Sequence, residues 1–229
     1  MAISRKLTIA AIANAVIVIA ELVVGFASGS LSLIGDALHN LTDAAALVLT
    51  LIAVRLERRP ATTAKTYGYQ RAGVLAAFVN SAVLLALTGM VAKEAIERLR
   101  TPHAVETSAM FITAAIAMLI NAATAMSLRR DGRSDVNIRS AMIHMIGDAV
   151  SSAGIIAGAI LIRITGATQW DAIVSLFIGV LILWSSWGVL KESVNLLLEG
   201  TPSGIDTEEV SRAIGAIDGI LGIHHLHIW

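Results

Sequence analysis

Two histidine–aspartate pairs in this chain combine residue types that ligate metal ions with one repeated spacing. His39 precedes Asp43 by four residues, and His144 precedes Asp148 by the same interval. Residues i and i+4 of an α-helix share a face, so each pair presents an imidazole and a carboxylate together. Two such pairs on facing helices would supply two nitrogens and two oxygens. That set suits tetrahedral Zn²⁺ and also accepts other borderline divalent ions.

Both pairs lie inside long apolar segments, where ionisable side chains are costly. An Asp at the centre of a membrane helix costs roughly 2.5–3.5 kcal/mol on insertion scales. With segment midpoints near residues 43 and 151, and a rise of ~1.5 Å per residue, all four side chains fall within ~11 Å of the midplane. Interhelical hydrogen bonding alone is the alternative explanation for such residues. The recurrence of His-x-x-x-Asp in two separate segments favours metal binding.

Further polar residues in these segments have several possible roles. Asp36 and Asn40 lie on the same helical stripe as His39 and Asp43. Asp36 could act as a gate, orient His39 through a hydrogen bond, or be a charge near the start of the helix. The role of Glu21 is equally open. The chain has no cysteine. Thiolate ligands and disulfides are therefore excluded, and any metal site must use His, Asp, Glu or backbone oxygen.

Composition places these segments in a membrane. Apolar residues make up 56% of the chain and charged residues 15%, with a mean hydropathy of +0.76; soluble domains have about 45–50% and about 25%. The apolar residues form blocks of about the ~20 residues that span a bilayer. The first block is too long for a signal peptide. We predict an all-α six-transmembrane-helix bundle over residues 1–202, with spans near 6–28, 31–55, 72–97, 106–128, 138–163 and 169–194.

Lysine and arginine distribution predicts the orientation of these spans. Basic residues concentrate in cytoplasmic loops. With the N-terminus inside, the outer segments hold only Arg98, Arg100 and Arg163. The inner segments hold Arg5, Lys6, Arg55, Arg58, Arg59, Lys65, Arg71, Arg129, Arg130, Arg133 and Arg139. Both termini are therefore expected in the cytoplasm. The formal net charge of zero gives no reason to expect a nucleic-acid partner.

Residues 203–229 mix polar and apolar residues, unlike the apolar blocks. Asp206 and Thr207 can cap a short helix that begins near Glu208. The segment is too short to bury a core by itself. We expect it to be the start of an incomplete C-terminal cytoplasmic domain. His224 and His227, in the final stretch, are additional candidate metal ligands.

Four stretches of the chain together resemble the cation diffusion facilitator family, zinc-transporter branch. They are Ser30–Asp43, Tyr67–Arg71, Ser140–Asp148 and Leu196–Pro202. The resemblance implies six helices, a homodimer, metal/proton antiport out of the cytoplasm, and transport-site ligands at His39, Asp43, His144 and Asp148. It implies zinc preference over cadmium from His at position 39. It also implies a ferredoxin-like cytoplasmic domain, whose opening motif resembles His224–Trp229.

Two departures from the family pattern affect these implications. We expect most of the cytoplasmic domain to be missing, which leaves open its metal sites, its regulation and its share of the dimer interface. Some family members have a His-rich loop between helices four and five. The corresponding residues 129–139 contain no histidine, so this loop cannot collect metal by imidazole.

The chemistry of the four candidate ligands is consistent with antiport. Imidazole and carboxylate bind metal only when deprotonated, so protons and metal compete for the same atoms. We predict a secondary active transporter, not an enzyme. Zn²⁺ is its expected main substrate, and Cd²⁺, Co²⁺, Ni²⁺ and Fe²⁺ are further candidate substrates. It would be a multi-pass protein of the bacterial inner membrane, with lipid, metal ions and protons as its partners. The alternative is a non-transporting membrane sensor or scaffold with a structural metal.

Overall fold

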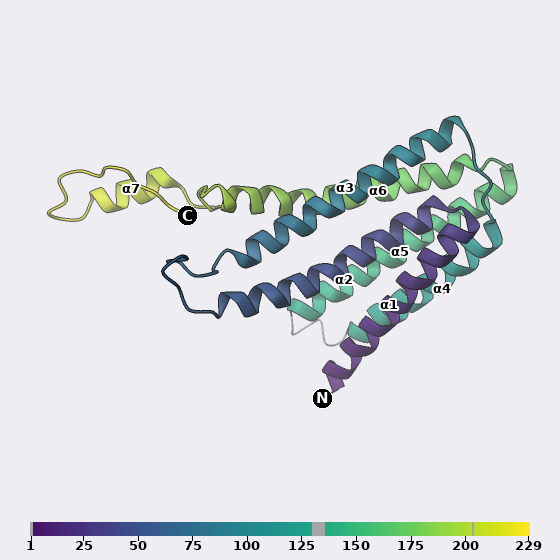
Figure 1. The fold of residues 1–229 in the computed structure, drawn as a ribbon, viewed down its shortest axis with the longest axis horizontal. Coiled ribbons are helices and arrows are strands. Elements are labelled where there is room, and N and C mark those ends of the chain that lie inside the picture. The colour runs from purple at the N-terminus through teal and green to yellow at the C-terminus, as the bar shows by residue number, and fades with distance from the viewer. Residues whose placement is uncertain (1, 130–135, 203) are drawn as a thin grey trace. The chain divides into compact units, whose positions relative to one another are not determined.

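The computed structural model describes residues 2–129, 136–202 and 204–229. Among the basic side chains counted above, those of Arg5, Lys6, Arg130 and Arg133 lie outside the description. Seven helices are seen: α1 (Ala2–Ser28), α2 (Leu31–Glu57), α3 (Ala72–Arg100), α4 (Thr107–Leu128), α5 (Val136–Thr165), α6 (Gln169–Leu197) and α7 (Thr207–Gly215) (Figure 1).

The first six helices are each long and apolar enough to cross a membrane. Their bounds agree with the six predicted blocks to within a few residues at each end. Within the described residues there is no β-strand, only an isolated bridge between Thr62 and Lys65. The prediction of an all-α bundle with six membrane-spanning helices is therefore confirmed.

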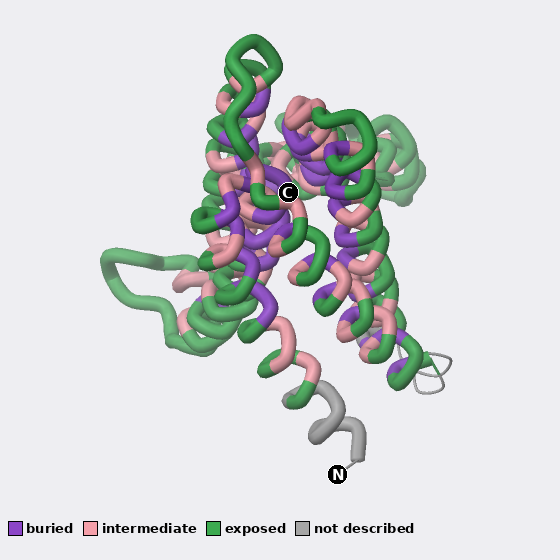
Figure 2. The backbone as a smooth tube through the Cα atoms, turned by 90° about the vertical axis from the view of Figure 1, so that its right-hand side faces the viewer, coloured by how far each residue is buried: buried purple, intermediate pink, exposed green. Residues whose placement is uncertain are grey.

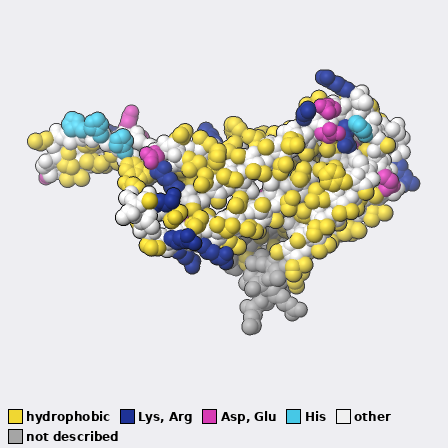
Figure 3. All heavy atoms as spheres, viewed as in Figure 1, with side chains coloured by type: hydrophobic (Ala, Val, Ile, Leu, Met, Phe, Trp, Pro, Cys, Tyr) yellow, Lys and Arg dark blue, Asp and Glu magenta, His cyan; other side chains and the backbone are white. Residues whose placement is uncertain are grey.

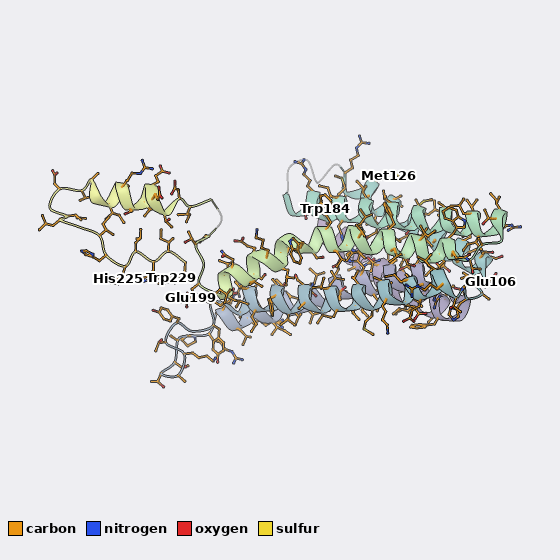
Figure 4. The ribbon with its side chains drawn as sticks, turned by 90° about the horizontal axis from the view of Figure 1, so that it is seen from above. Glu106, Met126, Trp184, Glu199, His225 and Trp229 are labelled. Atoms are coloured by element: carbon orange, nitrogen blue, oxygen red, sulfur yellow. The ribbon has the colours of Figure 1, made fainter. Side chains whose placement is uncertain are left out.

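Two local features set helix boundaries near one end of the bundle. Gly29 separates α1 from α2 with a φ of +72°, a conformation that glycine adopts without a Cβ penalty. Glu106 caps α4 and accepts hydrogen bonds from the N–H groups of Ala109 (2.7 Å) and Ser108 (3.0 Å) (Figure 4). These bonds, that from Ala109 first, hold the pKa of the Glu106 carboxyl below its usual value of 4.5.

The chain divides into two compact units, of which residues 1–44 and 84–183 form the first. Its core draws on five helices: Leu33 from α2, Leu84 from α3, Met110 and Ala114 from α4, Ile155, Ala159 and Ile162 from α5, and Ile178 and Ile182 from α6. Within this unit α4 packs against both α1 and α5. Figure 2 shows buried residues recurring along one side of the helices, with exposed residues on the other.

The second unit comprises residues 45–83 and 184–229. Glu57 Oε1 accepts a hydrogen bond from the Gly73 N–H at 3.0 Å. Arg71 Nη1 and Glu199 Oε1 lie 3.3 Å apart on the surface, and this ion pair connects two of the motif stretches. Helix α7 is capped by Asp206, which accepts from the N–H groups of Glu208 and Glu209, and has no buried residue.

Large apolar side chains cover the outer faces of the spans. Ile19, Val23 and Phe26 of α1 are each more than 60% exposed. Figure 3 shows hydrophobic side chains along the helices and most Lys and Arg near helix ends and loops. Such faces are suited to lipid, where each helix satisfies its own backbone hydrogen bonds.

Candidate transport site

Helices α2 and α5 bring the four predicted ligands together within the first unit. Asp43 Oδ2 lies 3.7 Å from His39 Nε2 of its own helix and 3.5 Å from His144 Nε2 of α5. His144 Nε2 lies 3.6 Å from Asp148 Oδ2. The imidazole rings of His39 and His144 have centroids 6.3 Å apart and an interplanar angle of 71°. Residues from helices distant in sequence thus form one cluster.

The donor atoms in this cluster are close neighbours but are not hydrogen-bonded to one another. Distances of 3.5–3.7 Å exceed the range for an N–H···O bond. Ligands that lie 2.0–2.1 Å from a tetrahedral Zn²⁺ are separated from one another by about 3.3 Å. The distances between adjacent donors in this cluster are therefore slightly longer than the separation of two ligands of one Zn²⁺ ion.

The four donors form a row in the order His39, Asp43, His144 and Asp148, without a common centre. In the part of the chain that the structure describes, no group of three or more such side chains is already arranged to hold a metal ion. The His39 and Asp148 atoms, at the two ends of the row, would have to move toward the middle pair. His39 and Asp43 remain partly exposed, with 20% and 29% of their side-chain surfaces accessible.

Asp36 lies next to this row of donors, but its hydrogen bond is with a serine of α5. It is 1% exposed, and its Oδ1 accepts a hydrogen bond from the Ser151 hydroxyl of α5. Within the described residues, His39 Nδ1 has no hydrogen-bond partner, so Asp36 does not orient that ring through a hydrogen bond. Glu21 of α1 is fully buried and interacts with Asp36.

The two further candidate ligands near the end of the chain lie apart from this cluster in the division of the chain. His224 and His227 are exposed, in the second unit, and belong to no potential metal-holding group among the described residues.

Sequence reasoning did not identify Ser151 or Asp171, although both make buried contacts with α2. Asp171 of α6 is 1% exposed and accepts hydrogen bonds from residues 30–32. In sequence it is an ordinary acid in the first turn of a span, where it complements the helix dipole. Ser151 is one of two adjacent serines in an apolar helix. Neither carries a local signal of its partner.

Six apolar helices with a partly exposed cluster of imidazoles and carboxylates are typical of a polytopic membrane protein of the ion-transport class. Comparison with known proteins narrows this class to one family. Residues 7–198 match the model of the cation efflux transmembrane domain. The chain belongs to the cation efflux family and is a transporter of metal cations, not an enzyme.

Individual relatives are similar over nearly the whole chain. The zinc transporter ZitB of Escherichia coli (strain K12) is 41% identical over 228 residues, which are 99% of this chain and 73% of ZitB. The cation efflux system protein CzcD of Alcaligenes sp. (strain CT14) is 39% identical over 98% of this chain and 71% of its own length. The cadmium, cobalt and zinc/H(+)-K(+) antiporter of Bacillus subtilis (strain 168) is 38% identical over 92% and 68%.

Proposed function

We propose that this protein exports Zn²⁺ from the cytoplasm in exchange for protons, and that His39, Asp43, His144 and Asp148 bind the transported ion. The observation that carries the proposal is the position of Asp43 Oδ2, within 3.7 Å of one imidazole from α2 and one from α5. A carboxylate between two imidazoles offers three adjacent donors to a divalent ion. Asp148 completes the set from the second helix.

Proton coupling follows from the chemistry of these donors. Each imidazole nitrogen and carboxylate oxygen binds metal only in its deprotonated form. A site that opens alternately to the two sides of the membrane would therefore release metal where protons are abundant and bind it where they are scarce. The B. subtilis relative is named a cadmium, cobalt and zinc/H(+)-K(+) antiporter, which supports an exchange of zinc for protons here.

The identity of the ion rests on the donor set and on the relatives. Two nitrogens and two oxygens suit tetrahedral Zn²⁺, and the ZitB relative is named a zinc transporter. Cd²⁺ and Co²⁺ are named for the B. subtilis relative and are secondary substrates in this proposal. The family resemblance implies a homodimer, and the Lys/Arg distribution predicts that both termini lie in the cytoplasm.

The test is Zn²⁺ flux by purified protein in liposomes with an imposed pH gradient. We expect uptake to follow the size and direction of the gradient. His144→Ala should abolish flux, whereas His103→Ala, which removes an exposed imidazole outside the spans, should leave it unchanged. Flux that ignores the gradient would refute proton coupling, and metal binding without any flux would support a sensor or scaffold instead.

A further inference from the structure

The buried carboxylate of Asp171 is fully engaged with the beginning of a different helix. Its Oδ2 accepts a hydrogen bond from the Leu31 N–H at 2.6 Å. Its Oδ1 accepts from the Ser32 hydroxyl at 2.5 Å, the Ser30 hydroxyl at 2.9 Å and the Ser32 N–H at 3.2 Å. Asp171 belongs to the first turn of α6, and all of its donors belong to the first turn of α2 or the residue before it.

This arrangement is a helix cap supplied from another helix. The first N–H groups of a helix have no partner within it and are usually satisfied by a side chain just before the helix. At α2 two of these N–H groups are satisfied by a residue about 140 positions away in sequence. The carboxylate also lies at the positive end of the α2 dipole, which favours its negative charge. Away from water, neither partner has an equivalent alternative.

Two other segments hold the same turn in place. Arg98 of α3 donates from Nη1 to the Gly29 carbonyl at 2.5 Å. The Glu106 N–H donates to the Ser28 carbonyl at 2.8 Å. A Cβ on Gly29 would lie 2.7 Å from the Ala104 carbonyl oxygen, so the backbones are in close contact there. All of these residues belong to the first compact unit.

We propose that Asp171 is a positioning residue for transport, which anchors the beginning of α2 to α6 throughout the transport cycle. His39 and Asp43 lie eight and twelve residues beyond Leu31 on α2, or about 12 and 18 Å along the helix. An anchor at residues 30–32 fixes the axial position and rotation of these two donors relative to α6, which shares the core of the first unit with α5. The inference rests on the proposed transport site.

An anchor explains the contacts better than a gate does. A gate at this point would have to break all four hydrogen bonds to the carboxylate in each cycle, together with those made by Arg98 and Glu106. It would also leave the N–H groups of Leu31 and Ser32 without their cap. Rearrangement elsewhere along α2 leaves these bonds intact.

A reversible crosslink distinguishes an anchor from a gate. The chain contains no cysteine, so Ser32→Cys and Asp171→Cys together create one defined thiol pair. We expect the double variant to transport Zn²⁺ slowly, a short bis-methanethiosulfonate crosslink to raise its flux toward the wild-type rate, and dithiothreitol to reverse the gain. Each single cysteine variant, treated in the same way, should show no gain. Flux that the crosslink blocks and reduction restores, or flux that it does not change, would overturn the anchor.

A charge-removing variant provides the second measurement. Asp171→Asn retains the shape of the side chain but replaces one acceptor oxygen by a donor. We expect the KM for Zn²⁺ to rise about tenfold, with a smaller change in maximal rate, because the donors on α2 lose their register. Ser175→Ala removes a buried hydroxyl of α6 that donates to the Asp171 backbone carbonyl and not to its carboxylate, so KM should remain unchanged. Equal KM values for Asp171→Asn and wild type, in monodisperse protein, would overturn the proposal.

The proposed transport site and the proposed anchor can be refuted separately. If Asp43→Ala retains wild-type flux, the proposed transport site is wrong. If Asp43→Ala is inactive and the 32–171 crosslink blocks flux, the site stands and the anchor is refuted.

Discussion

Replacing Ser151 by alanine tests how α2 and α5 are held together beside the transport site. The Ser151 hydroxyl donates to Asp36 Oδ1, and within the described residues the other carboxyl oxygen, Oδ2, has no hydrogen-bond partner. Asp36 is 1% exposed, so water cannot replace a lost donor without rearrangement. Ser151→Ala would remove this donor and leave the buried Oδ1 of Asp36 without it.

The expected magnitude follows from that burial. Leaving a buried acceptor unsatisfied costs about 1–3 kcal/mol. Side-chain hydrogen bonds within membranes average about 0.6 kcal/mol, with a maximum near 1.7. Because the Asp36 acceptor is almost inaccessible, the effect should lie at the upper end of the membrane range. We expect Ser151→Ala to lower the free energy of unfolding by about 1–2 kcal/mol.

The adjacent serine provides a matched control. Ser152 is fully buried on the same helix, but its hydroxyl has no hydrogen-bond partner among the described residues. Ser152→Ala should therefore be neutral or slightly stabilising, since it removes an unsatisfied buried hydroxyl. Equilibrium unfolding in mixed micelles, followed by circular dichroism, measures both variants. If Ser152→Ala destabilises the protein as much as Ser151→Ala, the reasoning from the Asp36 contact is wrong.

Three further predictions concern the transport site and a helix cap. Asp43→Ala or Asp148→Ala should reduce Zn²⁺ flux to that of empty liposomes while the helical circular dichroism signal persists; normal flux in either would refute the site. His39→Asp should raise the ratio of Cd²⁺ to Zn²⁺ flux, and an unchanged ratio would contradict the family-based assignment. Because the folded-state pKa of Glu106 is lowered, its stabilising contribution is complete above pH 4.5 and is lost as pH falls through the lower, folded-state value. The difference in thermal stability between wild type and Glu106→Ala should therefore shrink over that acidic range; a pH-independent difference would exclude this cause.

The six spans could be predicted from sequence because lipid imposes a strong local requirement. A segment in hydrocarbon must satisfy its own backbone hydrogen bonds and present apolar side chains over about 20 residues. The end of α1 at Ser28 and the start of α3 at Ala72 coincide with predicted block boundaries. Gly29 also has a local cause, since its positive φ favours glycine.

The residues of the candidate site could likewise be predicted from sequence, but the arrangement of their donor atoms could not. Helical periodicity places His39 beside Asp43 and His144 beside Asp148 whatever the helices pack against. It leaves open which atom of one pair meets which atom of the other. That Asp43 lies between the two imidazoles depends on the rotation and axial offset of α2 against α5.

The sequence by itself determined the membrane class, the six spans and the two histidine–aspartate pairs, because each follows from short-range periodicity and the solvent. Tertiary packing decided the row of four donors, the bond from Ser151 to Asp36 and the cap that Asp171 supplies to α2. The physical reason is separation along the chain. Each contact between helices joins residues more than a hundred positions apart, and only the packing of whole helices brings them within bonding distance.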